Sequence, residues 1–232
     1  MNEHYSDEIP FKNILEGTST LGYIHKTINF LEKYLPEFPQ YFKSKGVLKA
    51  SEEDISEYLY SFLQRKRRYN QENIEYPFEF QTEASQRQRA AGKKGHKRRI
   101  DIGVRINTFD IDMELIYCLE AKRLPTDRIG SDREKEYVTG NYGGINRFKK
   151  SQHGVNSQGE PIRRNGIVGY IQSLNAAHWH KQINSWISND TDWGSEELLN
   201  IKNIGSFSKL ESSHKRSGGG EVNLSHYWLM MN

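Results

Sequence analysis

Three residues that lie close together in the chain carry groups able to bind a metal and activate water. Asp101 and Glu120 supply carboxylates, and Lys122 supplies an ammonium group two positions after the glutamate. They fall in short apolar runs without proline, residues 100–104 and 115–122, which are typical of β-strands. A carboxylate on a buried strand is costly unless it binds a cation or forms an ion pair. The pattern therefore indicates a metal site or a set of structural salt bridges.

The period of two along a strand places Glu120 and Lys122 on one face, with Ala121 turned away. If the strand of Asp101 pairs antiparallel with this one, Asp101 lies beside Glu120. Two carboxylates and the main-chain carbonyl of Ala121 form an oxygen ligand set that suits Mg²⁺ or Mn²⁺ rather than zinc. The metal would lower the pKa of a bound water, and Lys122 would orient or deprotonate that water. The alternative is salt bridges to Lys122 or Arg123.

Length and composition indicate one good-sized globular domain. The chain has 232 residues, 35% hydrophobic and 27% charged, with a mean hydropathy of −0.84. Its apolar runs are too short to span a membrane, and its first residues are polar and acidic, unlike a signal peptide. The single cysteine, Cys118, lies in an apolar run and is expected to be a buried thiol. We therefore expect a cytoplasmic protein with no membrane partner.

The basic residues are unevenly distributed, although the net charge is only +3. Residues 85–99 hold seven Lys and Arg side chains and no acid, and they end in Arg98 and Arg99, just before Asp101. One interpretation is a solvated loop. The other, which its position favours, is an arm that contacts phosphate groups and delivers a polyanion to the candidate site.

Apolar periodicity predicts a mixed β-sheet flanked by helices, which is an α/β fold. An N-terminal helical segment, 1–50, is expected to pack on the remainder, 51–232, with Pro36 and Pro39 marking a break between helices. Ser51 is a plausible N-cap of the next helix. The other expected elements are strands at 78–83, 100–104, 115–122, 166–171 and 227–231, helices at 18–35 and 175–187, and a C-terminal β-hairpin.

The spacing of the candidate residues and the order of these elements resemble the PD-(D/E)XK superfamily of restriction-endonuclease-like proteins. Asp101 is followed by 18 residues and then by Glu120-Ala121-Lys122, and the resemblance extends over roughly residues 51–190. Ile100 replaces the proline of the nominal motif, at a position where many members also differ. The resemblance implies a restriction-endonuclease-like core and cleavage of phosphodiester bonds with Mg²⁺ or Mn²⁺.

Members of this superfamily often carry a further glutamate on the first core helix, and Glu52, Glu53 and Glu57 are the candidates here. At 100° per residue Glu52 lies on the same face as Ile55 and Leu59, so it is favoured for the site. Acidic residues in the first turn also stabilise a helix through its macrodipole, which accounts for all three equally well.

Four residues are candidates for contacts with nucleic acid, besides the basic run. Arg147 follows a glycine-rich turn that leads into a helix, an arrangement that can face a phosphate, although an ordinary surface loop is the alternative. Gln172 follows the fourth expected strand, where the resemblance places a polar residue beside the metal. His214 and Arg216 belong to a basic cluster before the last hairpin.

We therefore expect a metal-dependent DNA endonuclease. A restriction or antiphage defence role is implied by the resemblance alone. One metal site per chain suggests a homodimer or a subunit of a larger complex if both strands are cut. The alternatives are an RNA-directed nuclease with the same site, and a nucleic-acid-binding adaptor that keeps the fold without catalysis.

Overall fold

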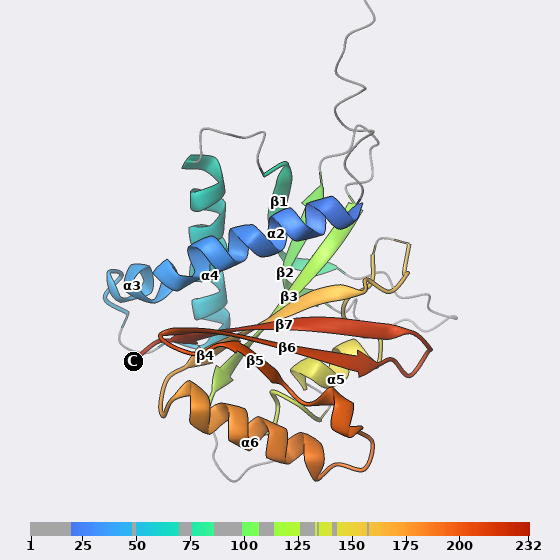
Figure 1. Ribbon diagram of the computed structural model, residues 1–232. Coiled ribbons are helices and arrows are strands. Elements are labelled where there is room, and N and C mark those ends of the chain that lie inside the picture. Colours follow the sequence, from blue (N-terminus) through green and yellow to red (C-terminus); the bar gives the residue numbers. More distant parts are fainter. Residues whose placement is uncertain are drawn as a thin grey trace, which may run out of the picture.

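A computed structural model of the protein shows one seven-stranded mixed β-sheet with helices on both faces (Figure 1). The structure describes residues 20–47, 50–69, 76–85, 99–106, 114–125, 133, 135–140, 143–156 and 158–232. The strands are β1 (Phe78–Ser85), β2 (Arg99–Ile106), β3 (Glu114–Leu124), β4 (Arg164–Ile171), β5 (Asn200–Asn203), β6 (Phe207–Lys215) and β7 (Glu221–Met230). The helices are α2 (Thr20–Tyr34), α3 (Phe38–Lys43), α4 (Glu52–Tyr69), α5 (Gly144–Lys149) and α6 (Ala176–Ser188), with 3₁₀ turns η1 (Leu35–Glu37) and η2 (Ser195–Glu197).

The strands pair antiparallel at both ends of the sheet and parallel in its middle. The strand order of the sheet is β1-β2-β3-β4-β7-β6-β5. Strand β2 is antiparallel to both of its neighbours, β1 and β3, whereas β3, β4 and β7 run parallel to one another and β6–β7 is an antiparallel hairpin. The predicted α/β fold, with a mixed sheet and a C-terminal hairpin, is confirmed. No helix in the described ranges has the length and apolarity to cross a membrane.

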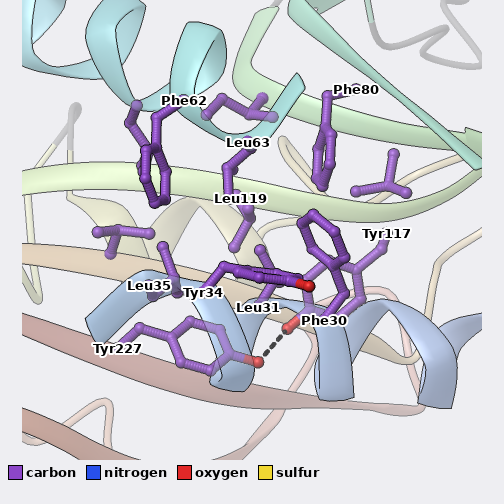
Figure 2. Close-up of a cluster of buried hydrophobic side chains, with 14 of the residues drawn as sticks. Phe30, Leu31, Tyr34, Leu35, Phe62, Leu63, Phe80, Tyr117, Leu119 and Tyr227 are labelled. Atoms are coloured by element: carbon purple, nitrogen blue, oxygen red, sulfur yellow. Dashed lines mark hydrogen bonds between the residues drawn. The ribbon is translucent and has the colours of Figure 1, made fainter. Parts of the chain in front are cut away.

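Helices α2, α3 and α4 cover one face of the sheet, and α5 and α6 lie on the other (Figure 1). On the first face, large side chains from the helices pack against odd-numbered residues of β3 (Figure 2); the set includes Phe30, Leu31, Leu35, Phe62, Leu63, Tyr117 and Leu119. On the second face, Trp179, Ile183 and Ile187 of α6 are buried against the sheet, as the helical spacing predicted. Burial of both faces explains why β3 and β4 read as nearly continuous apolar runs.

The start of α4 fixes the position of Glu52. The hydroxyl of Ser51 accepts a hydrogen bond from the Asp54 N–H at 3.0 Å, and Asp54 Oδ2 accepts one from the Ser51 N–H at 2.9 Å. This reciprocal capping box confirms Ser51 as the N-cap. Because Ile55 and Leu59 are buried against the sheet, the first turn of α4 lies at the edge of β3.

The proline pair marks the expected break between helices, because α2 ends at Tyr34 and a separate helix, α3, begins at Phe38. Pro36 lies in η1 and Pro39 lies in the first turn of α3, so each starts a new helical turn. A proline is tolerated there because its missing N–H has no acceptor within the first turn of a helix. The segment therefore changes direction at the prolines and stays packed on the sheet through Leu35 and Phe38.

We expect Phe30→Ala to lower the free energy of unfolding by about 3–5 kcal/mol, because the change empties a fully buried ring site. The ring of Phe30 lies 4.7 Å from that of Tyr34 and 4.9 Å from that of Tyr76. Leu21→Ala, in the same helix but at a side chain that is 53% exposed, is the control and should cost less than about 0.5 kcal/mol. Urea unfolding followed by circular dichroism measures both. Equal losses would show that α2 is not packed as described.

Candidate active site

The site lies where β2 and β3 stop pairing. Their ladder ends at Ile102↔Leu119, although both strands continue. Beyond that pair, Asp101 Oδ2 accepts a hydrogen bond from the Ala121 N–H at 2.7 Å, and Glu52 Oε2 accepts one from the Arg123 N–H at 2.9 Å. Two carboxylates thus take the backbone donors that β3 would otherwise offer to a strand neighbour. The gap in the ladder makes room for the site.

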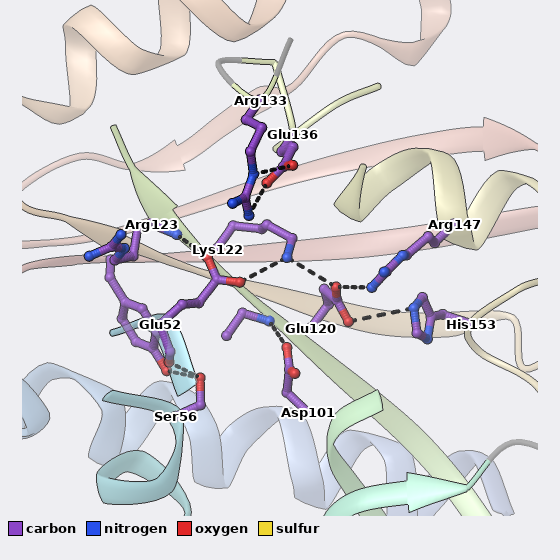
Figure 3. Close-up of polar contacts among 12 residues, drawn as sticks. Glu52, Ser56, Asp101, Glu120, Lys122, Arg123, Arg133, Glu136, Arg147 and His153 are labelled. Atoms are coloured by element: carbon purple, nitrogen blue, oxygen red, sulfur yellow. Dashed lines mark hydrogen bonds and ion pairs between the residues drawn. The ribbon is translucent and has the colours of Figure 1, made fainter. Parts of the chain in front are cut away.

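The side chains of β3 alternate as predicted. Ala121 belongs to the apolar cluster under α2 and α4, whereas Glu120 and Lys122 lie on the other face. Lys122 Nζ lies 2.9 Å from Glu52 Oε1 and 3.3 Å from Glu120 Oε1 (Figure 3). Asp101 is on the neighbouring antiparallel strand, one position beyond the last pair, so it lies beside Glu120. The sequence correctly predicted that these four residues converge.

Glu120 is the most buried charge of the group, with 1% of its surface exposed. Its Oε1 accepts a hydrogen bond from Arg147 of α5 at 2.9 Å, and His153 Nε2 lies 3.7 Å from its Oε2 (Figure 3). Among the described residues, nothing donates a hydrogen bond to Oε2. A buried carboxylate oxygen without a donor is a position that a cation would satisfy.

The electrostatics of the site follow from burial and mutual charge. Burial raises the pKa of Asp101 to about 8, and the charge of Glu120 adds to the rise. Burial alone would also raise the pKa of Glu120, but His153 and the two neighbouring cations outweigh it and hold that pKa below its usual value. Burial lowers the pKa of Lys122, but the surrounding carboxylates outweigh this effect and raise it. Lys122 is therefore an ammonium group and a donor at neutral pH.

A cavity of about 830 Å³ opens over these residues. Among the described residues, five carboxylates and three cationic side chains line it: Glu52, Glu53, Asp101, Glu120, Glu136, Lys122, Arg133 and Arg147. Two negative charges are left over when every group is ionised. The Arg133–Glu136 pair is bidentate, at 2.7 and 3.2 Å, and forms part of the rim. The cavity therefore attracts cations, and its two arginines, Arg133 and Arg147, are paired with Glu136 and Glu120.

The donor set suits a hard divalent cation. Asp101, Glu120 and the carbonyl of Ala121 supply oxygens, and that carbonyl faces the β2 side because the N–H and C=O of one strand residue point to the same edge. Mg²⁺ commonly takes one or two carboxylates and keeps several waters. Within the described ranges, no three His, Cys, Asp or Glu side chains form a group that could hold a metal ion. A metal here would thus depend on main-chain oxygen and water as well.

The other glutamates of α4 are less involved. Glu53 lines the cavity, and Glu57 is exposed on the helix. Gln172 is exposed just past β4, where its N–H donates to the carbonyl of Leu124, and it is not among the residues that line the cavity. Arg98 and the side chain of Arg99 lie outside the described residues. Among the predicted nucleic-acid contacts whose side chains the structure describes, only Arg147 lines the cavity.

His214 and Arg216 are not surface residues, which corrects their assignment as phosphate contacts. Both are at most 5% exposed. The Arg216 guanidinium donates to the carbonyls of Phe148 and Ile162, each at 2.8 Å, and further to Ser151 and Gly154. The cluster lies within β6 and the following turn, where alternation turns His214 inward and Lys215 outward.

A chain of buried hydrogen bonds explains the position of His214. Trp228 Nε1 lies 2.8 Å from the Tyr137 hydroxyl, which lies 2.8 Å from His226 Nδ1. On the other side of that ring, the Ser212 hydroxyl lies 2.7 Å from His226 Nε2 and 2.6 Å from His214 Nε2. The Trp228 N–H donates to the Tyr137 hydroxyl, and the directions of the remaining hydrogen bonds are set by the tautomers of His226 and His214. His214 Nδ1 then faces Glu197 at 3.3 Å, and Lys149 Nζ contacts both Glu197 oxygens at 2.7 Å. This network fixes α5 and the segment of Tyr137 to the C-terminal hairpin.

The sequence interpretation missed His153. It follows α5 in a turn whose Gly154 has a φ of +68°, and a Cβ at Gly154 would lie 2.8 Å from Asn165 Nδ2. Only glycine fits there, and the turn directs His153 at Glu120. The one local signal for His153 in the sequence was its position. It precedes Gly154 and follows shortly after the glycine-rich turn and Arg147.

Comparisons with family models, curated proteins and solved structures found no match to this chain. The resemblance to PD-(D/E)XK nucleases therefore stands on the residues of the chain itself: the spacing of Asp101 and Glu120-Ala121-Lys122, and the arrangement of those side chains around one cavity.

We expect Asp101→Asn to stabilise the metal-free protein at alkaline pH. The folded-state pKa of about 8 exceeds the unfolded value of 3.8, so folding binds a proton and stability falls as pH rises from about 4 to about 8. The variant carries no charge and escapes this loss. In EDTA its advantage should be near zero at pH 4 and reach several kcal/mol at pH 8.

Asp54→Asn is the control for that experiment. Its backbone and side-chain hydrogen bonds to Ser51 lower the pKa of Asp54, so its ionised form stabilises the fold above about pH 4 and the variant should be less stable there. Melting curves across pH test both signs. An Asp101→Asn protein that is less stable than the parent at pH 8 without metal would contradict the buried, raised-pKa carboxyl.

We expect Arg216→Met to cost about 2–4 kcal/mol, because buried carbonyls of the segment after α5 lose their donors. Lys215→Met, whose side chain is 76% exposed, is the neighbouring control and should leave the unfolding midpoint nearly unchanged. Denaturant unfolding measures stability, and fluorescence anisotropy measures the affinity of each folded variant for DNA. A large loss of DNA affinity in Arg216→Met at unchanged stability would restore the phosphate-contact interpretation.

Proposed function

We propose that this protein is a metal-dependent endonuclease of the PD-(D/E)XK type that hydrolyses phosphodiester bonds of DNA. The observation that carries the proposal is the convergence of Asp101, Glu120, Lys122 and Glu52 on one acidic cavity, with Glu120 keeping a buried oxygen that accepts no hydrogen bond from the described residues. The raised pKa of Asp101 supports it, because burial and the neighbouring charge of Glu120 both disfavour its ionised form, which a bound cation would stabilise.

Each residue has a distinct role in this proposal. Asp101 and Glu120, with the carbonyl of Ala121, would hold Mg²⁺ or Mn²⁺, which when bound polarises a phosphoryl oxygen and makes water a better nucleophile. Lys122 donates to the attacking water or to a phosphate oxygen and neutralises the charge that develops there. Its raised pKa favours this role over deprotonation of the water. Glu52 holds the Lys122 ammonium in place and also binds the Arg123 N–H.

The biological setting is part of the proposal. One candidate site in the chain would cut one strand, so cleavage of a duplex would need a homodimer or a larger assembly. The resemblance suggests a cytoplasmic restriction or antiphage defence system, and RNA is an alternative substrate that shares the same chemistry.

A second candidate function is a nucleic-acid-binding adaptor without catalysis. It is favoured by the ion pairs of Glu120, since Lys122 and Arg147 already neutralise this carboxylate without a metal. In that case Asp101 and Glu120 would be structural, and a divalent cation would not bind. The two functions therefore differ first in metal binding and only then in cleavage.

We expect the purified protein to cut DNA in Mg²⁺ and to lose this activity in EDTA. Lys122→Ala and Asp101→Asn should each slow cleavage by about 10²–10³-fold, because each removes a charge that stabilises the reacting phosphate or its metal. Lys181→Ala, at an exposed position on α6, is the matched control and should cut at the parental rate. Agarose electrophoresis of supercoiled plasmid measures nicking and linearisation.

Calorimetric titration with Mn²⁺ separates the two functions. A nuclease should bind Mn²⁺ in the parent and lose that binding in Asp101→Asn, while DNA affinity stays within about two-fold. An adaptor should bind DNA in both forms and Mn²⁺ in neither. Absence of divalent-metal binding in the parent would end the nuclease proposal even if DNA binding persisted.

A further inference from the structure

One oxygen of Glu120 carries two cationic donors while the other accepts no hydrogen bond from the described residues. The Arg147 guanidinium lies 2.9 Å from Oε1, and Lys122 Nζ lies 3.3 Å from the same oxygen. His153 Nε2 lies 3.7 Å from Oε2. A divalent cation that binds Glu120 would approach two positive charges at close range. Its binding is therefore opposed until one of them moves away.

Arg147 is the cation with room to move. Its side chain is 22% exposed and lines the cavity, whereas Lys122 is 7% exposed and is also held by Glu52. The backbone around Arg147 is fixed, because Arg216 bonds the carbonyl of Phe148 and Lys149 is paired with Glu197. The guanidinium can thus change partner while α5 stays in place.

We propose that Arg147 exchanges between Glu120 and a phosphate of the substrate, and in this way couples the binding of the phosphate to the binding of the metal. A phosphodiester in the cavity offers a guanidinium two acceptor oxygens in the planar geometry that arginine prefers. When Arg147 turns to the phosphate, one positive charge leaves Glu120, and a metal at its Oε2 then binds against less repulsion. This inference rests on the proposed nuclease function and adds its regulation: the metal binds more tightly when a phosphate is present.

The coupling must be reciprocal, because the two binding equilibria form one thermodynamic cycle. If the phosphate strengthens metal binding by a given factor, the metal strengthens phosphate binding by the same factor. Loss of the Arg147 charge should then have two opposite effects. It should tighten metal binding in the absence of nucleic acid, and it should remove most of the gain that nucleic acid produces.

The test is a Mn²⁺ titration of the full-length protein, followed by electron paramagnetic resonance, with and without a short hydrolysis-resistant phosphorothioate duplex. The duplex alone is titrated to correct for the Mn²⁺ that it binds. We expect the duplex to tighten Mn²⁺ binding to the parent at least about five-fold. Arg147→Gln should bind Mn²⁺ at least about five-fold more tightly than the parent without the duplex and show almost no further gain with it. Arg147→Lys, which keeps the charge, should retain a measurable part of the coupling.

Arg133→Gln is the matched control, since it removes the same charge from the same cavity at a residue that pairs with Glu136. It should keep the parental coupling. Equal coupling in the parent and Arg147→Gln, with Mn²⁺ still bound, would overturn this inference and leave the nuclease proposal standing. An equal loss in Arg133→Gln would also overturn it, because a general change of cavity charge would then explain the effect. Failure of the parent to bind Mn²⁺ would overturn both proposals.

Discussion

The buried carboxylate of Glu120 on β3 is the constraint on which the rest of this structure depends. Glu120 is almost fully enclosed at the middle of β3, and an isolated charge at such a position is strongly unfavourable. The fold supplies partners for this carboxylate from three segments: Lys122 from the same strand, Arg147 from α5 and His153 from the following turn. The arrangement of α5 against the sheet therefore serves an electrostatic need as well as packing.

The C-terminal hairpin holds these partners in place. Arg216 bonds the carbonyls on either side of the turn that carries His153, and the Lys149–Glu197 pair fixes the end of α5. Burying an ion pair rarely adds net stability, but removing one partner leaves an uncompensated charge. Such contacts are therefore well suited to fixing geometry. Arg216, in the turn between β6 and β7, and Glu197, in η2, lie far along the chain from the candidate ligands and thus determine where Arg147 can reach.

Local periodicity in the sequence correctly predicted the side-chain directions along β3 and in the first turn of α4. Alternation along β3 placed Glu120 and Lys122 on one face, and the 100° step of a helix selected Glu52 over its neighbours. The positions of His214 and Arg216 depend instead on strand order, because β6 pairs between β5 and β7 and its alternate residues face the layer of α6. A basic cluster reads the same in sequence whether it is exposed or enclosed. The charge pattern alone therefore could not separate a phosphate contact from a buried clamp, nor bring His153 to Glu120.

The charge of the cavity relates the protonation of Asp101 to the metal. Fully ionised, the lining of described residues carries two more negative than positive charges. One Mg²⁺ would balance this excess. Without a metal, a proton on Asp101 removes half of that excess, and its pKa of about 8 means that this proton is held at neutral pH. A divalent cation would displace the proton and neutralise the whole excess. The lining and its metal then have no net positive charge to balance a phosphodiester. Arg147, by leaving Glu120 for the phosphate, would place a positive charge directly beside it.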